Sequence, residues 1–509
     1  MRDLLFHLQP TAPTSLQAQI REKIVTAIVD GQLPEGDRMP SSRQLAHDLK
    51  VSRNTVTLAY QSLVDDGFLT GRERSGYYVA HARLETAKPT MRRPAPHPLP
   101  GPAAHAVDWR ARMALHPSEQ INVAKPENWA AQPYPFIYGQ VDANLFPIAE
   151  WRDCSRQAMG RRWMEDWASD HHASDDPMLV EQIRTRLLPR RGVMAGENEI
   201  LITLGAQHAL YLMSALLVTP LTTVACENPG YTDARNIFSL ATKRLVPVPV
   251  DEEGLIVDER LDGCDVVYAT PSHQAPTTVT MTEARRMALL DKARDQDFVV
   301  IEDDYEFETN YVCAPLPALK SLDRDGRVIY VGSLSKTIFP GLRLGYLVGP
   351  PQLIEEARAI RRLMVRHPPN NSQRTAALFL QLGHHDAMIL KLRRTYSERW
   401  RLMGDAIERH LPSLKRNPSH GGSSMWLKGP AGFDADVLAA AALAQGVVIE
   451  SGRAFFAGAT PQCNFFRLGF SSIEAGRIED GIKILARIIT GRSRPLVDTA
   501  RQRVVTARS

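Results

Sequence analysis

From about residue 119 to residue 490, short apolar runs alternate with stretches of helical periodicity, and this alternation most constrains the fold. Most of the runs end where small, polar or charged residues take over, as in 200–203, 266–269, 298–301 and 328–331. Strands that alternate with helices are typical of a parallel sheet covered by helices, and such sheets bind ligands at the carboxyl ends of their strands. The sequence therefore predicts an α/β domain with its site along one sheet edge.

The chain must contain more than one domain, because 509 residues are too many for one ordinary hydrophobic core. A segment rich in proline follows residue 82, and its prolines exclude a continuous helix, which indicates a linker. The residues after 490 are basic. We therefore expect four parts, an N-terminal domain, a linker, a ligand-binding domain and a basic tail, at 1–82, 83–118, 119–490 and 491–509.

Composition narrows the possible classes of protein. No apolar run approaches the roughly 20 residues that cross a bilayer, and the first residues make a poor signal peptide. The five cysteines are scattered without a CxxC pair, which argues against a disulfide framework or a zinc site and fits a reducing cytoplasm. The net charge is only +4, so any nucleic-acid site must be inferred from local placement rather than bulk charge.

The first 82 residues carry the pattern of a winged helix-turn-helix. A helix over 16–29 is followed by a second helix after Pro40, a short turn, and a third helix that starts at Ser52. The third helix buries one apolar face and exposes polar side chains near its N-terminus, where a recognition helix needs donors for the major groove. Residues 68–79 then predict a two-stranded wing with a basic tip.

A small helical domain with solvated charges is the alternative for a lone helix pair, but the complete order of elements is much rarer by chance. The pattern PSxRxLA…VSRxTV..AY..L resembles the GntR-type winged helix. This resemblance implies DNA contacts in the second and third helices and in the wing, at Arg43, Ser52, Arg53, Asn54, Thr55, Arg74 and Gly76.

One group of residues in the second half points to a specific chemistry. Lys336 lies just past the strand-like run 328–331, where a lysine can form a Schiff base with an aldehyde if its neighbours lower its pKa. The hydroxyls of Ser333 and Ser335 and the guanidinium of Arg343 are suited to hold a phosphate. A surface lysine beside serines is common, so Lys336 is weak evidence by itself.

Residues near the ends of other predicted strands could bind further parts of the same ligand. Asp303 follows a buried strand, where a carboxylate could keep a pyridine nitrogen protonated, although a helix cap is the alternative. The turn 205–207 leads from a strand into a helix whose first amides could bind a phosphate. Tyr305 could donate to a ring oxygen, Tyr231 could stack on a ring, and Arg467 could clamp a carboxylate.

Taken in chain order, these pieces resemble a fold-type I aminotransferase, and with the GntR-like head they resemble the MocR family of regulators over nearly the whole chain. The resemblance implies pyridoxal 5′-phosphate (PLP) bound to Lys336 as the aldimine lysine. It implies that Asp303 pairs with the pyridine nitrogen, Tyr305 with the 3-oxygen, and that Arg467 binds an effector carboxylate. It further implies stacking and phosphate-binding roles for Tyr231, Ser333, Ser335, Arg343, Gly205, Ala206 and Gln207.

Two departures from the family pattern fall around the expected effector pocket. Ala275 begins a stretch without the usual aromatic residue and glycine, and Asp175 and Asp176 stand near an expected glycine. We expect these acids to favour a ligand with a second amine, such as a diamino acid of ectoine catabolism.

The resulting expectation is a cytoplasmic, nucleoid-associated homodimer that reads two half-sites of double-stranded operator DNA. An amine or amino-acid effector would displace Lys336 as an external aldimine and alter DNA binding, with no catalytic residue and no metal assigned. One alternative is a working aminotransferase with an appended DNA-binding head, which sustained turnover would reveal. Another is a scaffold without PLP, against which the intact set of Lys336, Asp303 and Arg343 argues.

Overall fold

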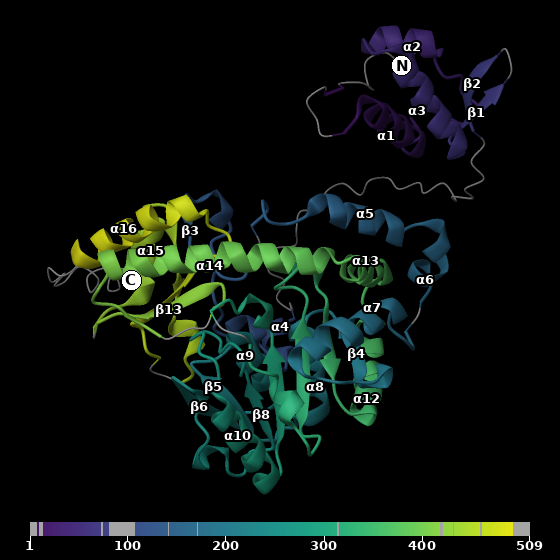
Figure 1. Ribbon diagram of the computed structural model, residues 1–509. Coiled ribbons are helices and arrows are strands. Elements are labelled where there is room, and N and C mark those ends of the chain that lie inside the picture. The colour runs from purple at the N-terminus through teal and green to yellow at the C-terminus, as the bar shows by residue number, and fades with distance from the viewer. Residues whose placement is uncertain are drawn as a thin grey trace. The chain divides into compact units, whose positions relative to one another are not determined.

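The computed structural model places most of the chain and divides it into two compact units, 1–109 and 110–509 (Figure 1). Residues 83–106 of the predicted linker and 492–509 of the predicted tail lie outside the described residues. No helix in the described part of the chain is long and apolar enough to cross a membrane. The described residues are 8–9, 14–72, 75–80, 107–140, 142–170, 172–312, 315–417, 421–430, 432–458 and 461–491.

The N-terminal unit is the predicted winged helix-turn-helix. Its elements are α1 (Leu16–Val29), α2 (Ser42–Leu49), α3 (Arg53–Asp65) and the antiparallel strands β1 (Leu69–Arg72) and β2 (Gly76–Val79). Serine hydroxyls start α2 and α3, because Ser41 accepts from the amide of Gln44 and Ser52 from that of Thr55. Each such cap contributes about 1 kcal/mol to helix stability.

One residue of α3 fixes its position against both of its neighbours. The Tyr60 ring is fully buried, and its hydroxyl donates to the carbonyl of Pro40, just before α2, at 2.9 Å. The same ring packs edge-on against Tyr77 of β2, with the centroids 4.9 Å apart. The α2–turn–α3 pair and the wing are therefore held by a common core.

The C-terminal unit is built on an eight-stranded sheet of order β4-β11-β10-β9-β8-β5-β6-β7. Five neighbouring strands in this order, from β10 to β6, pair in parallel. β11 runs antiparallel to both β10 and β4, so the sheet is mixed where the sequence predicted a parallel one. In sheet order the strands are Ile200–Thr203, Gly345–Val348, Val328–Ser333, Val299–Asp304, Val266–Ala269, Val224–Asn228, Leu245–Asp251 and Gly254–Leu255.

Helices cover both faces of this sheet (Figure 1). One face packs on α8 (Ala206–Leu217), α9 (Thr232–Ala241) and α12 (Pro351–Val365). The opposite face packs on two groups of helices. The members of those groups are α5 (Ile148–Ala158), α7 (Pro177–Gln182), α10 (Glu283–Gln296), α11 (Leu319–Leu322), α13 (Asn370–Gln381) and α14 (His384–His410).

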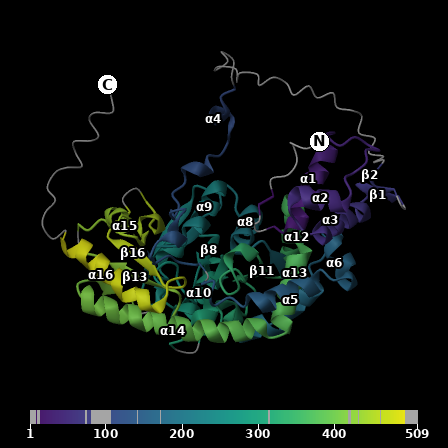
Figure 2. The same ribbon diagram turned by 90° about the horizontal axis from the view of Figure 1, so that it is seen from above.

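A smaller antiparallel sheet follows in the chain, with the order β12-β13-β16-β15. α14 contacts α13 at one end and α16 at the other, and Figure 2 shows it running along both parts of the unit. The remaining elements are α4 (Trp109–Arg112), β3 (Tyr134–Pro135), α6 (Met164–Ala168), β12 (Lys415–Arg416), β13 (Ser424–Lys428), α15 (Ala435–Leu443), β14 (Val447–Val448), β15 (Glu450–Ser451), β16 (Phe465–Gly469) and α16 (Ala475–Gly491).

The end of β9 carries three consecutive buried acids, and each has a different compensating partner. Glu302 accepts from the backbone amides that begin α11, at 2.7 and 2.8 Å. Asp303 accepts from the hydroxyl of Tyr268 at 2.9 Å. Asp304 pairs with the fully buried guanidinium of Arg191 at 2.6 Å. Buried carboxylates are costly unless paired, so these contacts hold the strand end in place.

Replacement of Arg191 tests this dependence. Arg191→Leu leaves the Asp304 carboxylate buried without its cation, and we expect it to lower the free energy of unfolding by about 3–5 kcal/mol. The neighbouring Arg190 forms a half-exposed pair with Asp386, so Arg190→Leu should lower it by less than about 1 kcal/mol. Urea unfolding followed by circular dichroism measures both, and equal losses would contradict the argument.

Candidate functional site

The N-terminal unit presents its polar recognition surface at the start of α3. Arg53 and Asn54 are exposed there, and Arg43 is exposed on α2. The hydroxyls of Ser52 and Thr55 lie 2.8 Å apart, so these two residues shape the helix start as well as lying on its surface. Gly76 is exposed at the start of β2, whereas Arg74 lies outside the described residues.

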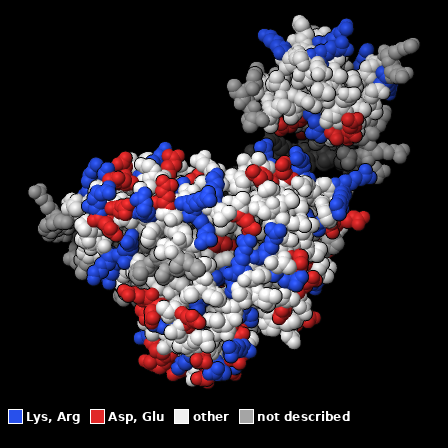
Figure 3. All heavy atoms as spheres, viewed as in Figure 1, with Lys and Arg blue, Asp and Glu red and all other residues white. Residues whose placement is uncertain are grey.

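Additional basic residues surround this surface and were not among the predicted contacts. Arg38, Lys50 and Arg72 are exposed, and Arg72 lies over the ring of Tyr78 in the wing, 4.6 Å from its centroid. Lys and Arg side chains gather on the part of this unit that carries α2 and the wing (Figure 3). Such an arrangement suits contacts to a phosphate backbone next to base-reading donors.

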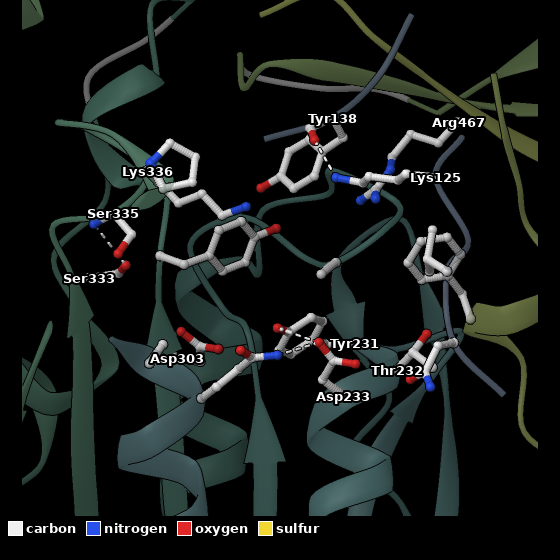
Figure 4. Close-up of a pocket in the computed structure, with 18 of the residues that line it drawn as sticks. Lys125, Tyr138, Tyr231, Thr232, Asp233, Asp303, Ser333, Ser335, Lys336 and Arg467 are labelled. Carbon is white, nitrogen blue, oxygen red and sulfur yellow. Dashed lines mark hydrogen bonds between the residues drawn. The ribbon is translucent and has the colours of Figure 1, made fainter. Parts of the chain in front are cut away.

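The C-terminal unit contains a cavity of about 330 Å³ at the carboxyl edge of the large sheet. The structure brings together there all of the predicted cofactor and effector residues except Gly205 (Figure 4). They come from the start of α8, the loop after β5, the ends of β9 and β10 with the loops that follow them, the loop before β11, and β16. The set is Ala206, Gln207, Tyr231, Asp303, Tyr305, Ser333, Ser335, Lys336, Arg343 and Arg467.

Lys336 projects into this cavity from the loop after β10 (Figure 4). Its ammonium lies 4.3 Å from the centroid of the Tyr138 ring, and a side chain at Gly139 would begin 2.5 Å from it. Burial lowers the pKa of Lys336 to about 8. A lysine in this state has an accessible neutral form, which is the nucleophilic one.

Asp303 faces the same cavity with one oxygen satisfied and one free. Oδ2 accepts from Tyr268, while Oδ1 is buried without a hydrogen-bond partner among the described residues. Burial raises the pKa of Asp303 to about 7, against the opposing effect of the Tyr268 hydroxyl. A buried acceptor aimed into a cavity matches a ligand that donates a proton or carries a positive charge.

Donors converge at one side of the cavity. Arg343 has a left-handed backbone (φ 51°) and donates from a terminal nitrogen to the carbonyl of Leu204 at 3.0 Å. A Cβ on Gly205 would lie 3.1 Å from that guanidinium, so the glycine permits the close approach. Ser333 ends β10, and the hydroxyl of Ser335 donates to the carbonyl of Leu344, the residue after Arg343, at 3.5 Å. The first amides of α8 follow Gly205. This grouping is suited to bind a phosphate.

Arg467 lies at the far side of the cavity in contact with a carboxylate that the sequence did not reveal. Its Nε donates to Oε2 of the buried Glu450 at 2.7 Å. Lys125 lies beside both, with its Nζ 3.7 Å from Oε1 of Glu450. In Figure 4 the side chains of Lys125 and Arg467 lie together, across the Tyr138 ring from Lys336.

The acid pair Asp175–Asp176 does not have the position that the sequence interpretation gave it. Asp175 pairs with Arg358 at 2.8 Å and with Arg361 at 2.5 Å, and Asp176 pairs with Arg374 at 2.6 Å. These buried ion pairs tie the start of α7 to α12 and α13, so neither acid is available to a second amine. Ala275, the other departure, does line the cavity.

Several cavity residues were missed from the sequence. Tyr268, Tyr138, Lys125, Glu450 and Phe455 all touch the predicted group or line the cavity. For Tyr268 a signal existed, since a tyrosine inside an otherwise aliphatic strand run requires a hydrogen-bond partner when buried. For the others nothing local distinguishes them from ordinary surface or core residues.

Comparison with known families matches both units. Residues 16–79 match the model for bacterial regulatory proteins of the gntR family, and residues 174–485 match that for aminotransferase class I and II. The chain is 43% identical to the HTH-type transcriptional regulator TauR of Rhodobacter capsulatus, over 95% of this chain and 98% of that protein. It is 31% identical to the probable rhizopine catabolism regulatory protein MocR of Rhizobium meliloti, over 94% of each.

Solved structures match the C-terminal unit. The kynurenine aminotransferase of Pyrococcus horikoshii, crystallised with PMP, superposes with a TM-score of 0.68 at 28% identity, over 75% of this chain and 98% of that one. The α-aminoadipate aminotransferase LysN of Thermus thermophilus, complexed with N-(5′-phosphopyridoxyl)-L-leucine, gives 0.69 at 27% identity, over 76% and 99%. The aminotransferase fold and these complexes imply PLP as the cofactor.

Three independent observations show that the residues of the cavity fit PLP. The unpartnered Oδ1 of Asp303 offers an acceptor for a protonated ring nitrogen. The guanidinium of Arg343 approaches Gly205 closely, and this forms a phosphate-sized recess that a side chain at position 205 would fill. The buried Lys336 has the lowered pKa that reaction with an aldehyde requires.

The pKa of Lys336 generates a prediction for cofactor loading. Only the neutral amine attacks an aldehyde, so the rate at which PLP develops a visible absorption band on the cofactor-free protein should rise with pH and level off above about 8. A lysine at its usual pKa, near 10.4, would give a rate that still rises about tenfold between pH 8 and pH 9. Stopped-flow absorbance measures the profile, with Lys336→Ala as the control that develops no band.

Proposed function

Since this chain belongs to the MocR-type family of transcriptional regulators, we propose that it senses a small amine or amino acid through PLP held on Lys336. The observation that carries the proposal is the convergence of Lys336, Asp303 and Arg343 on one cavity in a chain that also has a GntR-type DNA-binding unit. When bound, PLP supplies an electrophilic carbon that an amine can attack.

The surrounding side chains would each have one task. Asp303 would hold the proton of the pyridine nitrogen, with Tyr268 fixing its other oxygen. Tyr305 would donate to the 3-oxygen, and Tyr231, whose hydroxyl donates to Asp233 at 3.1 Å, would stack on the ring. Lys336 would give up its place on the cofactor to the effector amine, and its own released amine would remain inside the buried cavity.

The N-terminal unit would read operator DNA with the start of α3. Arg53 and Asn54 would reach base edges in the major groove, while Arg43, Lys50 and Arg72 would contact phosphates. A homodimer built on the aminotransferase-like units would present two such heads to two half-sites. The protein would act on the nucleoid, in the cytoplasm.

Residues 120–125, here called the strap, would carry the effect of the bound effector toward the DNA-binding unit. The strap follows the linker directly in the chain and lines the cavity with Asn122, Val123 and Lys125. It is pinned to α9, because Gln120 donates to the carbonyl of Asn236 at 3.0 Å and Asn236 donates to the carbonyl of Ile121 at 3.0 Å. An effector that contacts the strap would bias the linker only if its affinity differs between two strap positions.

The second candidate is a working aminotransferase with a DNA-binding head, because the cavity keeps every residue that the cofactor chemistry would need. We favour the sensor because the two relatives, matched over nearly the whole chain, are named as regulators. The two functions differ in turnover, since a sensor binds an amine without sustained transfer of its amino group to a keto acid.

A crossed pair of variants tests the proposal. DNA binding is measured with a duplex that the purified protein selects from a pool of random sequences. Lys336→Ala should abolish the visible PLP band and the effect of amines on DNA affinity, but should keep DNA binding itself. Arg53→Ala should keep the band and weaken duplex binding about tenfold, the loss expected for one bidentate base contact.

The readouts are visible absorbance and fluorescence anisotropy of the labelled duplex. If each variant lost both the visible PLP band and the binding of the duplex, the proposal of two separate sites would be wrong. Repeated amino transfer to 2-oxoglutarate by the wild-type protein would favour the aminotransferase instead.

A further inference from the structure

The loop after β3 brings an aromatic ring to the amine of Lys336. Tyr138 is buried, and Nζ of Lys336 lies 4.3 Å from the centroid of its ring. A cation this close to the face of an aromatic ring is attracted to it, and more strongly where water is excluded. Gly139 leaves room for the amine, because a Cβ at this position would lie 2.5 Å from Nζ. Tyr138 and Gly139 therefore form a site that can hold the ammonium of Lys336.

Three contacts fix the Tyr138 ring. Its backbone packs on β16, where a Cβ on Gly469 would lie 2.5 Å from the Tyr138 nitrogen. Its hydroxyl donates to Oε2 of Glu306 at 3.2 Å. The Arg467 guanidinium lies 4.1 Å from the ring centroid, on the side of the ring away from Lys336 (Figure 4). These contacts hold the ring independently of Lys336.

At the hydroxyl end of the ring, Glu306 supplies a buried negative charge that the proposed function does not use. Its side chain is 4% exposed, and Nε2 of His273 lies 3.6 Å from its Oε2. Oε1 accepts from the hydroxyl of Ser423 at 2.5 Å. Glu306 is thus held by partners of its own, and its charge favours a positive charge on the nearby Lys336.

The groups around Lys336 leave it charged near neutral pH when it is not bonded to the cofactor. Burial lowers the pKa of Lys336 to about 8, and among its neighbours Glu306 opposes this effect most. Lys125 and Arg467 lower the pKa further, whereas Glu450 raises it. At pH 7 the ammonium therefore still predominates over the neutral amine by about tenfold.

The exchange of amines in the proposed function would create this free ammonium. The nitrogen of the entering amine forms a bond to the cofactor carbon, and the bond from that carbon to the Lys336 nitrogen breaks. The protons that the entering nitrogen loses pass to Lys336. A cationic amine enters and a cationic lysine is released, so charge and electrons balance without another reactant.

Transfer of the amino group to a keto acid would require a further step, in which a base removes a proton from the carbon next to the bound nitrogen. Neutral Lys336 would be suited to this task, because its amine is released in the same space. Asp303 faces the opposite end of the proposed cofactor site, and Asp233 accepts from Gln207 and from Tyr231. The protonation and position of Lys336 therefore decide whether a bound amine reacts further.

We propose that Tyr138, with Glu306 at its hydroxyl, holds the released Lys336 as an ammonium and so withholds the base that amino transfer requires. The site then binds an amine without turning it over. This inference rests on the proposed sensing function and gives a physical reason for sensing in place of catalysis. Tyr138 and Glu306 are positioning residues, since both act through Lys336.

The first test measures proton exchange in the full chain loaded with PLP. Glycine, 3-aminopropanoate and n-propylamine are compared, and the probe that shifts the visible band at the lowest concentration is incubated in D2O. NMR follows the replacement of its hydrogens next to nitrogen by deuterium. Tyr138→Leu removes the ring and should raise the exchange rate about tenfold. Tyr138→Phe keeps the ring face and should stay within about threefold of the wild-type protein.

The second test uses the cofactor-free protein and no amine. The pH at which the rate of PLP attachment levels off reports the pKa of Lys336. The ring and the carboxylate both stabilise the ammonium form, so Tyr138→Leu and Glu306→Gln should each lower this pH, by about one unit. Glu306→Gln should also raise the rate of proton exchange. Tyr134→Leu makes the same substitution on β3, outside the cavity, and should change neither the exchange rate nor the pH profile.

The variants separate the inference from a loss of folding and from the proposed function. Equal exchange rates in the wild-type protein and Tyr138→Leu would overturn the inference, and so would an equal rise in Tyr138→Phe and Tyr138→Leu. If Tyr138→Leu loses the visible band, Glu306→Gln decides, and an unchanged exchange rate and pH profile in that variant would overturn the inference. If no probe shifts the band of the wild-type protein while the pH profiles move as expected, the sensing function fails and the contact of Lys336 with Tyr138 stands.

Discussion

The burial of three successive carboxylates at the end of β9 is the constraint from which the organisation of the C-terminal unit follows. Each acid is stabilised by a different part of the chain. Glu302 accepts hydrogen bonds from the amides at the start of α11, Asp303 accepts one from Tyr268 of β8, and Asp304 forms an ion pair with Arg191. Arg191 also donates to the carbonyl of Leu316 at 2.7 Å, so it joins the segment before α11 to the same cluster. Because an unpaired buried charge is so costly, these contacts hold the segments together at the sheet edge that carries the cavity.

Burial at this sheet edge also sets the protonation chemistry of the cavity. Asp303 is left with one oxygen facing the cavity, and the same burial that raises the pKa of Asp303 to about 7 lowers that of Lys336 to about 8. The same cavity thus holds a carboxyl group and an amine whose pKa values both lie near neutral pH. Groups poised in this way are typical of functional sites, since in water both would be fully ionised at neutral pH.

Sequence reasoning found the parts of the site that are local in the chain. Lys336, Asp303 and the turn 205–207 lie at or just past the ends of strands, so the rule that ligand sites occur at strand ends located them. Lys125 and Glu450 are 325 positions apart by number, and only the folded chain brings them to Arg467. The same limit explains two errors. The antiparallel course of β11 depends on its neighbours β10 and β4. Asp175 and Asp176 were assigned to the effector pocket, but their partners on α12 and α13 lie 183 to 198 residues later in the chain.

Under the proposed function, occupancy of the cavity in the C-terminal unit has to change the DNA-binding unit. The acids at the end of β9 are less suited to transmit this change, because loss of any of their partners would leave a buried carboxylate unpaired. The strap is held by side-chain amide hydrogen bonds to α9 at Asn236 and by the 3.7 Å approach of Lys125 to the buried Glu450. In the proposed function, the strap is the segment whose position an effector in the cavity would change, since it lines the cavity near the N-terminal end of this unit.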